Sequence, residues 1–153
     1  MVENVHYKEP GKLTRRVMNP VVSLATRAGV SIWGSRILEV RGRTSGSPRR
    51  TPVNLLELDG RQYLVSPRGN GQWVRNVRAN DGRLTLVLGR RRDERVAHEL
   101  TDDEKPPVLR AYLRRWKMEV GVFFDGVTGD SDDGELRRIA PDHPVFLLSE
   151  RAN

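Results

Sequence analysis

The sequence predicts a mainly β fold, a small β-barrel with helices on its outside. About six short runs of apolar and β-branched residues are separated by turn signals, as in barrels of antiparallel strands. Few segments show the three- and four-residue spacing of an amphipathic helix. At 153 residues the chain suits one hydrophobic core. We therefore expect a single domain over residues 1–153.

The N-terminal part of the chain is predicted to be a flexible start, residues 1–10, followed by a helical segment, residues 11–28. Apolar residues recur along that segment at helical spacing: Leu13, Val17, Val21, Leu24 and Ala28. Pro20 divides it into two pieces, because a proline inside a helix removes a hydrogen-bond donor. Such a stripe usually packs on its own core, and the basic residues beside it leave open peripheral contact with a membrane.

A strand and a hairpin are predicted next. The strand is Ile37–Arg41. The hairpin consists of Val53–Leu58 and Gln62–Ser66, which flank Asp59-Gly60. An Asp-Gly pair between two such runs is typical of a tight hairpin turn, because both turn residues need positive φ.

A second hairpin and a last strand complete the predicted sheet. Leu84–Leu88 and Arg95–Leu100 form the hairpin and are joined by the charged turn Gly89–Glu94. Val145–Leu148 is the last strand. Between the two hairpins, Gln72–Ala79 has apolar residues at helical spacing and predicts a short helix, which Asn80-Asp81-Gly82 ends.

The clearest long helix covers residues 106–118, where one apolar stripe faces a row of arginines. Thr101 and Glu104 fit a capping box upstream. We place the start at Pro106-Pro107 instead, since prolines lose nothing in the first turn of a helix. Gly126–Gly134 is expected to be a polar loop.

Composition excludes several classes of protein. The chain has no cysteine, which rules out disulfide frameworks, zinc fingers, iron–sulfur sites and thiol nucleophiles. No apolar run is long enough to span a membrane, and the start lacks a secretory signal, so we expect a cytoplasmic protein. His6, His98 and His143 match no metal-ligand spacing and are expected at the surface or in strands, so we expect no metal site.

The net charge of +7 belongs to the middle of the chain. Between Arg36 and His98 there are fourteen arginines and six acidic residues, whereas Glu99–Ala140 has more acids than bases. A field confined to one region can steer an anionic partner to one face. Nucleic acid, a membrane surface and an anionic small molecule all remain open as partners, as does a merely solubilising arginine surface.

Two segments carry candidate chemistry. Gly42–Val53 joins two predicted strands and offers two glycines, hydroxyl side chains beside backbone amides, and three arginines. Backbone N–H groups and arginine forks of this kind bind anions, although an ordinary polar turn fits equally well. Ser66–Asn76 is a glycine-containing loop that leads into a helix start, another anion-attracting arrangement. Trp73 could flank a flat ligand or anchor the core.

Together, these two segments resemble the deazaflavin-dependent nitroreductase family. The similarity extends from Asn19-Pro20 to Leu148. It implies a split β-barrel of the flavin and deazaflavin oxidoreductase superfamily, related to pyridoxamine phosphate oxidases. It also implies binding of coenzyme F-420, an 8-hydroxy-5-deazaflavin whose tail carries a phosphate and glutamates, with FMN as the alternative cofactor.

The resemblance also assigns roles to particular residues. In the first segment it implies that the phosphate and tail are bound by Arg43, Thr44, Ser45, Gly46, Arg49, Arg50, Thr51, Pro52 and Val53. In the second segment it implies that the deazaflavin ring is bordered by Ser66, Pro67, Arg68, Gly69, Trp73, Val74, Arg75 and Asn76. Thr44 stands where the family often has lysine.

The implied reaction is hydride transfer from carbon C5 of the reduced deazaflavin to a quinone, nitro compound or conjugated carbonyl. Water, Ser66 or Tyr112 could deliver the accompanying proton. A non-catalytic split barrel that binds a lipid or another flavin is the alternative. A nucleic-acid binder is the third hypothesis and the weakest, because basic charge alone is not a motif, and we expect no nucleic acid partner. A monomer and a homodimer both remain open.

Overall fold

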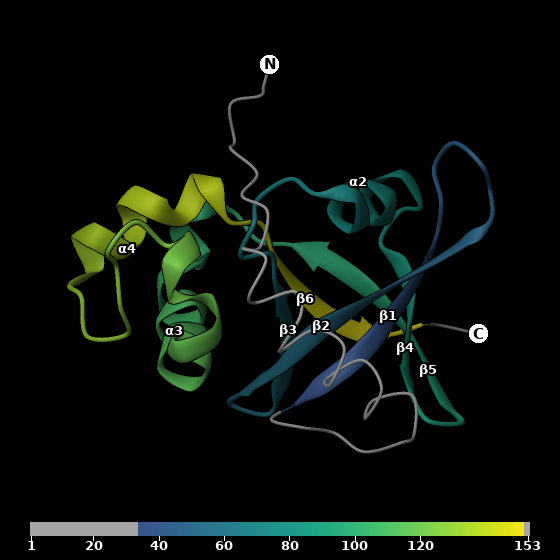
Figure 1. The fold of residues 1–153 in the computed structure, drawn as a ribbon, viewed down its shortest axis with the longest axis horizontal. Helices are drawn as coiled ribbons and strands as arrows, with labels where there is room; N and C mark the ends of the chain where they lie inside the picture. Colours follow the sequence, from purple (N-terminus) through teal and green to yellow (C-terminus); the bar gives the residue numbers. More distant parts are fainter. Residues whose placement is uncertain (1–33, 152–153) are drawn as a thin grey trace. The chain divides into compact units, whose positions relative to one another are not determined.

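The computed structural model of the chain describes residues 34–151, in which six strands and three helices form (Figure 1). The strands are β1 (Ser35–Arg41), β2 (Pro48–Leu58), β3 (Arg61–Val65), β4 (Arg83–Leu88), β5 (Arg91–Glu99) and β6 (Val145–Glu150). The helices are α2 (Gln72–Ala79), α3 (Pro106–Val120) and α4 (Asp133–Ile139). The predicted flexible start and N-terminal helical segment, residues 1–28, lie outside the described residues.

The six strands form a closed antiparallel barrel in the order β1-β2-β3-β6-β5-β4. A closed barrel leaves no unpaired sheet edge, which is how small β proteins satisfy their backbone groups. The predicted fold class, a mainly β barrel with a few helices, is confirmed.

The described chain divides into two compact units. The first, which we call the helical unit, comprises Leu56–Gly71 and Glu99–Leu147 and contains β3, α3 and α4. The second, the strand unit, comprises residues 34–55, Gln72–His98 and residues 148–151 and contains β1, α2 and β4. Strands β2 and β6 each run through both units. The expectation of one domain stays a prediction.

In the strand unit, β1 pairs with both β2 and β4, and α2 packs against β1. The Val74 and Val77 side chains of α2 are fully buried. The helix occupies the predicted residues and ends as predicted, since Asp81 and Gly82 both have positive φ. A side chain at Gly82 would come within 2.3 Å of the Ala97 carbonyl oxygen, so only glycine fits there.

Two strands begin four or five residues earlier than predicted. Strand β2 starts at Pro48 rather than Val53, because the turn before it already closes at Ser47, whose carbonyl accepts a hydrogen bond from Gly42. Strand β5 starts at Arg91 rather than Arg95, and the turn predicted as Gly89–Glu94 is only two residues long. The first residues of both strands are charged, polar or proline, and most are exposed. These stretches therefore lack the apolar pattern by which a strand is recognised in a sequence.

The first predicted hairpin is confirmed in the helical unit. Asp59 and Gly60 both have positive φ, 52° and 77°. Positive φ at both residues is what the Asp-Gly pair predicted for a two-residue hairpin turn.

Helix α3 starts at Pro106, as predicted. The upstream capping signal is used as well, since Glu104 accepts hydrogen bonds from the backbone nitrogen and hydroxyl of Thr101 around a short 3-10 turn at Asp102–Glu104. The helix is kinked at Trp116, which has non-helical backbone angles. The core of this unit gathers around α3 and includes Leu109, Tyr112, Leu113, Trp116, Phe124, Leu136 and Ile139.

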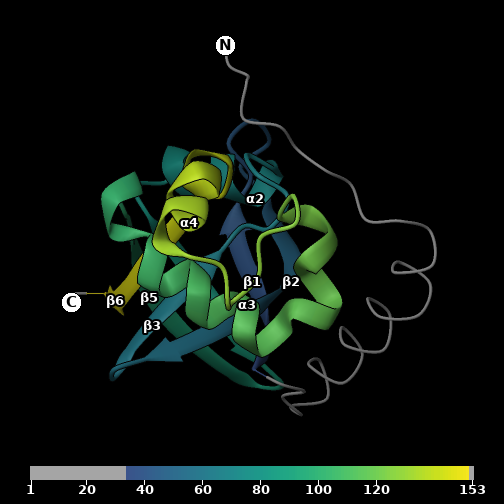
Figure 2. The same cartoon turned by 90° about the vertical axis from the view of Figure 1, so that its left-hand side faces the viewer.

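Helix α4 lies beside α3 (Figure 2) and begins inside the stretch Gly126–Gly134 that the sequence presented as a loop. Asp132 caps it by accepting a hydrogen bond from the backbone nitrogen of Glu135, 2.9 Å away. Leu136 and Ile139 are buried. The loop expectation was therefore wrong at its last two residues, and the helix that follows was missed.

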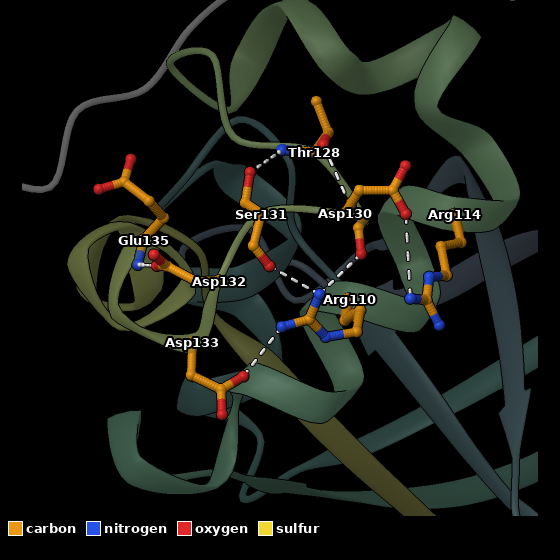
Figure 3. Close-up of polar contacts among 9 residues, drawn as sticks. Arg110, Arg114, Thr128, Asp130, Ser131, Asp132, Asp133 and Glu135 are labelled. Atoms are coloured by element: carbon orange, nitrogen blue, oxygen red, sulfur yellow. Dashed lines mark hydrogen bonds and ion pairs between the residues drawn. The ribbon is translucent and has the colours of Figure 1, made fainter.

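The segment before α4 is held by one arginine of α3 (Figure 3). Arg110 donates hydrogen bonds to the carbonyl oxygens of Gly129 and Ser131, at 2.8 and 2.7 Å, and to the carboxylate of Asp133 at 2.9 Å. Arg114, one turn along, lies 3.9 Å from the Asp130 carboxylate. Among the described residues no helix is long and apolar enough to cross a membrane.

Candidate cofactor-binding site

The turn between β1 and β2 is a tight, internally bonded loop in the strand unit. Gly42 donates to the carbonyl of Ser47 at 2.8 Å, and Gly46 donates to the carbonyl of Gly42 at 2.9 Å. The nitrogen of Ser47 donates to the hydroxyl of Ser45 at 3.1 Å. Gly46 has a φ of 75°, and a side chain at Gly42 would come within 2.8 Å of the Ser45 hydroxyl oxygen. The positive φ of Gly46 favours glycine there, and a side chain at Gly42 would require the Ser45 side chain to move.

The side chain of Asn76 joins helix α2 to this turn. The Asn76 side-chain oxygen accepts a hydrogen bond from the backbone nitrogen of Arg43 at 3.0 Å and another from the Arg43 guanidinium at 2.8 Å. Asn76 is only 5% exposed. The structure thus brings together parts of the two sequence motifs, the arginine-bearing turn and the middle of the Trp-containing helix.

Asn80, at the end of the same helix, was predicted only as a helix terminator. Its side-chain nitrogen donates to the carbonyl oxygens of Arg41 and Asn76, both at 2.8 Å. Arg41 is the last residue of β1, so Asn80 ties the end of that strand to the helix. The spacing of Asn76 and Asn80, four residues apart on a helix, is the signal that could have shown them acting together.

The donors that the turn offers to a ligand are mainly side chains. The backbone nitrogens of Gly42, Arg43, Gly46 and Ser47 already bond within the protein, so the expected convergence of backbone amides on an anion does not describe this turn well. The exposed residues of the motif are Arg43, Thr44, Ser45, Gly46, Arg49, Arg50 and Pro52, while Thr51 and Val53 are half-buried. Exposed guanidinium and hydroxyl groups fit a phosphate and a chain of carboxylates.

Arg50 has an acidic partner. Its Nε donates to Glu39 of β1 at 2.8 Å, and Glu39 also bonds to Arg92 of β5. The hydrogen bond from Arg92 is the largest influence on Glu39 and lowers its pKa; partial burial opposes this effect, and the hydrogen bond from Arg50 adds to it. Glu39 therefore stays ionised and holds two arginines of the strand unit.

The loop that follows Ser66 belongs to the helical unit. Ser66 is 2% exposed, and its hydroxyl donates to the carbonyl of Gly69 at 2.5 Å. The backbone of Ser66 is held on both sides, because its nitrogen donates to Pro144 and its carbonyl lies 3.2 Å from Nδ1 of His143. Gly69 has a φ of 90°, which favours glycine, and it is buried, whereas Pro67 and Arg68 are half-buried.

His143 corrects a prediction. The sequence placed it at the surface or in a strand, but it precedes β6 and is 1% exposed. Its ring stacks on Phe124, with centroids 4.1 Å apart. A histidine seventy-seven positions away in sequence thus supports the Ser66 loop, and no local pattern could have shown this.

The remaining predicted site residues lie either on α2 or in the core of the helical unit. On α2, Trp73 is half-buried, Val74 is buried and Arg75 is exposed. Tyr112 is 2% exposed and lies in the core of the helical unit, with its ring centroid 5.0 Å from Trp116 and 6.2 Å from Phe124.

The chain is a closed antiparallel barrel with an arginine-rich turn, and a hydrogen bond joins this turn to a short helix that follows a glycine loop. This arrangement is typical of a barrel protein that binds an anionic cofactor. The family comparison agrees with this class. A family model described as F-420H(2)-dependent quinone reductase matches residues 13–122, and the chain belongs to that family. It is therefore an oxidoreductase whose cofactor is coenzyme F-420, and the resemblance to deazaflavin-dependent reductases is confirmed.

Solved structures show the same fold at low sequence identity. One, described as a domain-swapped dimer, is 20% identical with a TM-score of 0.55 over 92% of this chain and 100% of that chain. A structure described as an F-420-H2-dependent reductase is 20% identical, with a TM-score of 0.50 over 76% of this chain and 94% of that chain. A protein of unknown function from Agrobacterium tumefaciens is 17% identical, with a TM-score of 0.53 over 95% of this chain and 58% of that chain. A search of curated proteins found no match.

Proposed function

We propose that the protein reduces a small organic acceptor with reduced coenzyme F-420, with quinones as the first class to test and nitro compounds and conjugated carbonyls as the others. The observation that carries the proposal is the double hydrogen bond between Arg43 and Asn76. This contact joins the two segments that resemble a deazaflavin site. The chain belongs to a family described as F-420H(2)-dependent quinone reductases, which supports quinones as the first acceptors to test.

In this proposal the β1–β2 turn binds the anionic tail of the coenzyme. Arg43 and Arg49 supply exposed guanidinium groups, which pair bidentately with phosphate and carboxylate, and Thr44 and Ser45 supply hydroxyl donors. Gly46 permits the turn, and residues 50–53 continue the contact along β2. Thr44 replaces a charged side chain by a neutral one, so the neighbouring arginines carry the charge of this site.

The Ser66 loop and α2 are proposed to border the deazaflavin ring. Pro67, Arg68 and Trp73 are each half-buried, as expected of side chains that keep one face for a flat ligand. Ser66 and Gly69 shape the loop through their own hydrogen bond, while Val74 and Arg75 continue the border along the helix.

When bound, the reduced coenzyme supplies a hydride from carbon C5 of its ring. A quinone that accepts this hydride needs one proton to become a hydroquinone. The Ser66 hydroxyl already donates a hydrogen bond to the carbonyl of Gly69, and Tyr112 is enclosed in the core. We therefore propose water as the proton source, with the protein contributing orientation of the two reactants.

The test is a fluorescence or calorimetric titration with oxidised coenzyme F-420, with FMN as the competing cofactor. Micromolar or tighter binding of coenzyme F-420, and weaker binding of FMN, is expected. Turnover is then followed by the absorbance of the oxidised deazaflavin, with a water-soluble naphthoquinone, a nitroaromatic and an enone as acceptors. No saturable binding of coenzyme F-420 would reject the proposal, and binding without reduction of any of the three acceptors would reject the proposed acceptor classes.

A further inference from the structure

Asn76 uses its side-chain oxygen in a way that differs from the role implied by the family resemblance. That oxygen accepts two hydrogen bonds, both from Arg43. An amide oxygen has two lone pairs, so these bonds use its accepting capacity. A residue that borders a flavin-like ring would be expected to offer that oxygen to the ligand.

The position of Asn76 makes it a rigid support. Its side chain is 5% exposed, and its helical neighbours Val74 and Val77 are completely buried. Because α2 also packs against β1, the Asn76 oxygen is a fixed point in the strand unit. One bond fixes the backbone of Arg43 and the other fixes its guanidinium, so the turn and its cation are both held.

Asn80 holds the other side of the same turn. Its bond to the carbonyl of Arg41 and the Asn76 bond to the nitrogen of Arg43 enclose Gly42. Two asparagines four residues apart, Asn76 in α2 and Asn80 directly after it, therefore hold the backbone where β1 passes into the turn. An arginine held in this way needs less ordering when an anion binds, which favours affinity.

We propose that Asn76 is a positioning residue for the anionic tail of coenzyme F-420 and acts through Arg43 rather than on the deazaflavin ring. The inference rests on the proposed function. It predicts that loss of the Asn76 oxygen weakens contacts to the tail and leaves contacts to the ring intact.

The experiment compares two ligands on the purified full-length chain. One is oxidised coenzyme F-420; the other is the ribityl deazaflavin that lacks the phosphate and glutamates. Asn76→Leu keeps the size of the side chain and removes the acceptor. We expect it to weaken coenzyme binding by about 10- to 150-fold, the range for a lost bond to a charged group. Binding of the tail-free deazaflavin should change less than about twofold.

A second variant guards against misfolding of Asn76→Leu. Arg43→Ala leaves α2 intact and removes the side-chain bond from residue 43 to Asn76. It should also weaken coenzyme binding selectively, and its loss should not add to that of Asn76→Leu in the double variant. In addition, Arg43→Ala should show a shallower dependence of coenzyme affinity on salt than the wild type, because it has lost one ionic contact.

Equal weakening of both ligands by Asn76→Leu would overturn the inference and assign Asn76 to the ring. Unchanged coenzyme affinity in a folded Asn76→Leu protein, or fully additive losses in the double variant, would also overturn it. These outcomes leave the proposed function in place, because they require a wild-type protein that binds the coenzyme. A wild-type protein that does not bind it overturns both.

Discussion

Arg49 and Arg50 are adjacent residues of β2 with different surroundings. Arg50 bonds to Glu39, whereas Arg49 is exposed on the tail-binding turn that we propose. We expect Arg49→Ala to weaken coenzyme F-420 binding by about 1–3 kcal/mol, the cost of losing a charge-assisted hydrogen bond. The measurement is a calorimetric titration at fixed salt.

Arg91→Ala is the matched control for this prediction. It removes the same charge from the exposed start of β5, outside the proposed site, where Arg91 lies 3.5 Å from Asp93. It should change the affinity by less than about 0.5 kcal/mol, since exposed charges are well screened. Equal losses in the two variants would mean that general positive charge, and not the turn, attracts the coenzyme.

At the residue scale, the sequence indicated two segments as a candidate site but not which contacts their side chains make. The glycines and arginines of the turn were recognisable because their chemistry is local. The bond from Arg43 to Asn76 and the contact of His143 with Ser66 join residues thirty-three and seventy-seven positions apart. Such pairings depend on how the barrel closes, and no spacing rule predicts them.

At the scale of elements, the sequence located α2, the start of α3 and the Asp59-Gly60 hairpin, each of which has a local chemical signal. It missed α4, although Asp132 and Glu135 have the spacing of a helix cap and Leu136 and Ile139 follow it. The glycines and acids before that helix resembled a loop. A short amphipathic helix becomes stable only through its packing on α3, which no local pattern contains.

The contact between α3 and the segment before α4 gives a prediction about stability. Arg110 supplies three hydrogen bonds to that segment (Figure 3). Arg110→Met keeps the aliphatic part of the side chain and removes these donors, leaving carbonyl groups without partners. We expect the free energy of unfolding to fall by about 1–3 kcal/mol, measured by urea denaturation.

Arg114→Met is the control, since it makes the same chemical change one turn along α3. Arg114 is well exposed and lies 3.9 Å from Asp130, so its loss should cost less than about 0.5 kcal/mol. If the two variants lost the same stability, the Arg110 contacts would not be what fastens this segment.

At the scale of the whole molecule, the charge map becomes a property of the two units. The described part of the strand unit has thirteen arginines and five acidic residues, whereas the described part of the helical unit has nine basic and thirteen acidic residues. The sequence located the positive charge in the middle of the chain but could not show that α2, β4 and β5 belong with the arginine-bearing turn. The excess positive charge lies in the strand unit, which also contains the turn that we propose to bind the tail.

The division into two units raises the question of whether they unfold together. Strand β2 passes from one unit to the other at Leu55–Leu56, and β6 passes at Leu147–Leu148. Unfolding one unit alone would leave part of each of these two strands without its support, so we expect one cooperative transition. Trp116 is buried in the helical unit, so its fluorescence in a Trp33→Phe/Trp73→Phe variant reports on that unit, while far-UV circular dichroism reports on both. The two signals should give the same midpoint in urea, at each of two protein concentrations, so that dissociation of an oligomer is not mistaken for unfolding. Two separated midpoints would show that the units are independently folding domains and that the single-domain expectation is wrong.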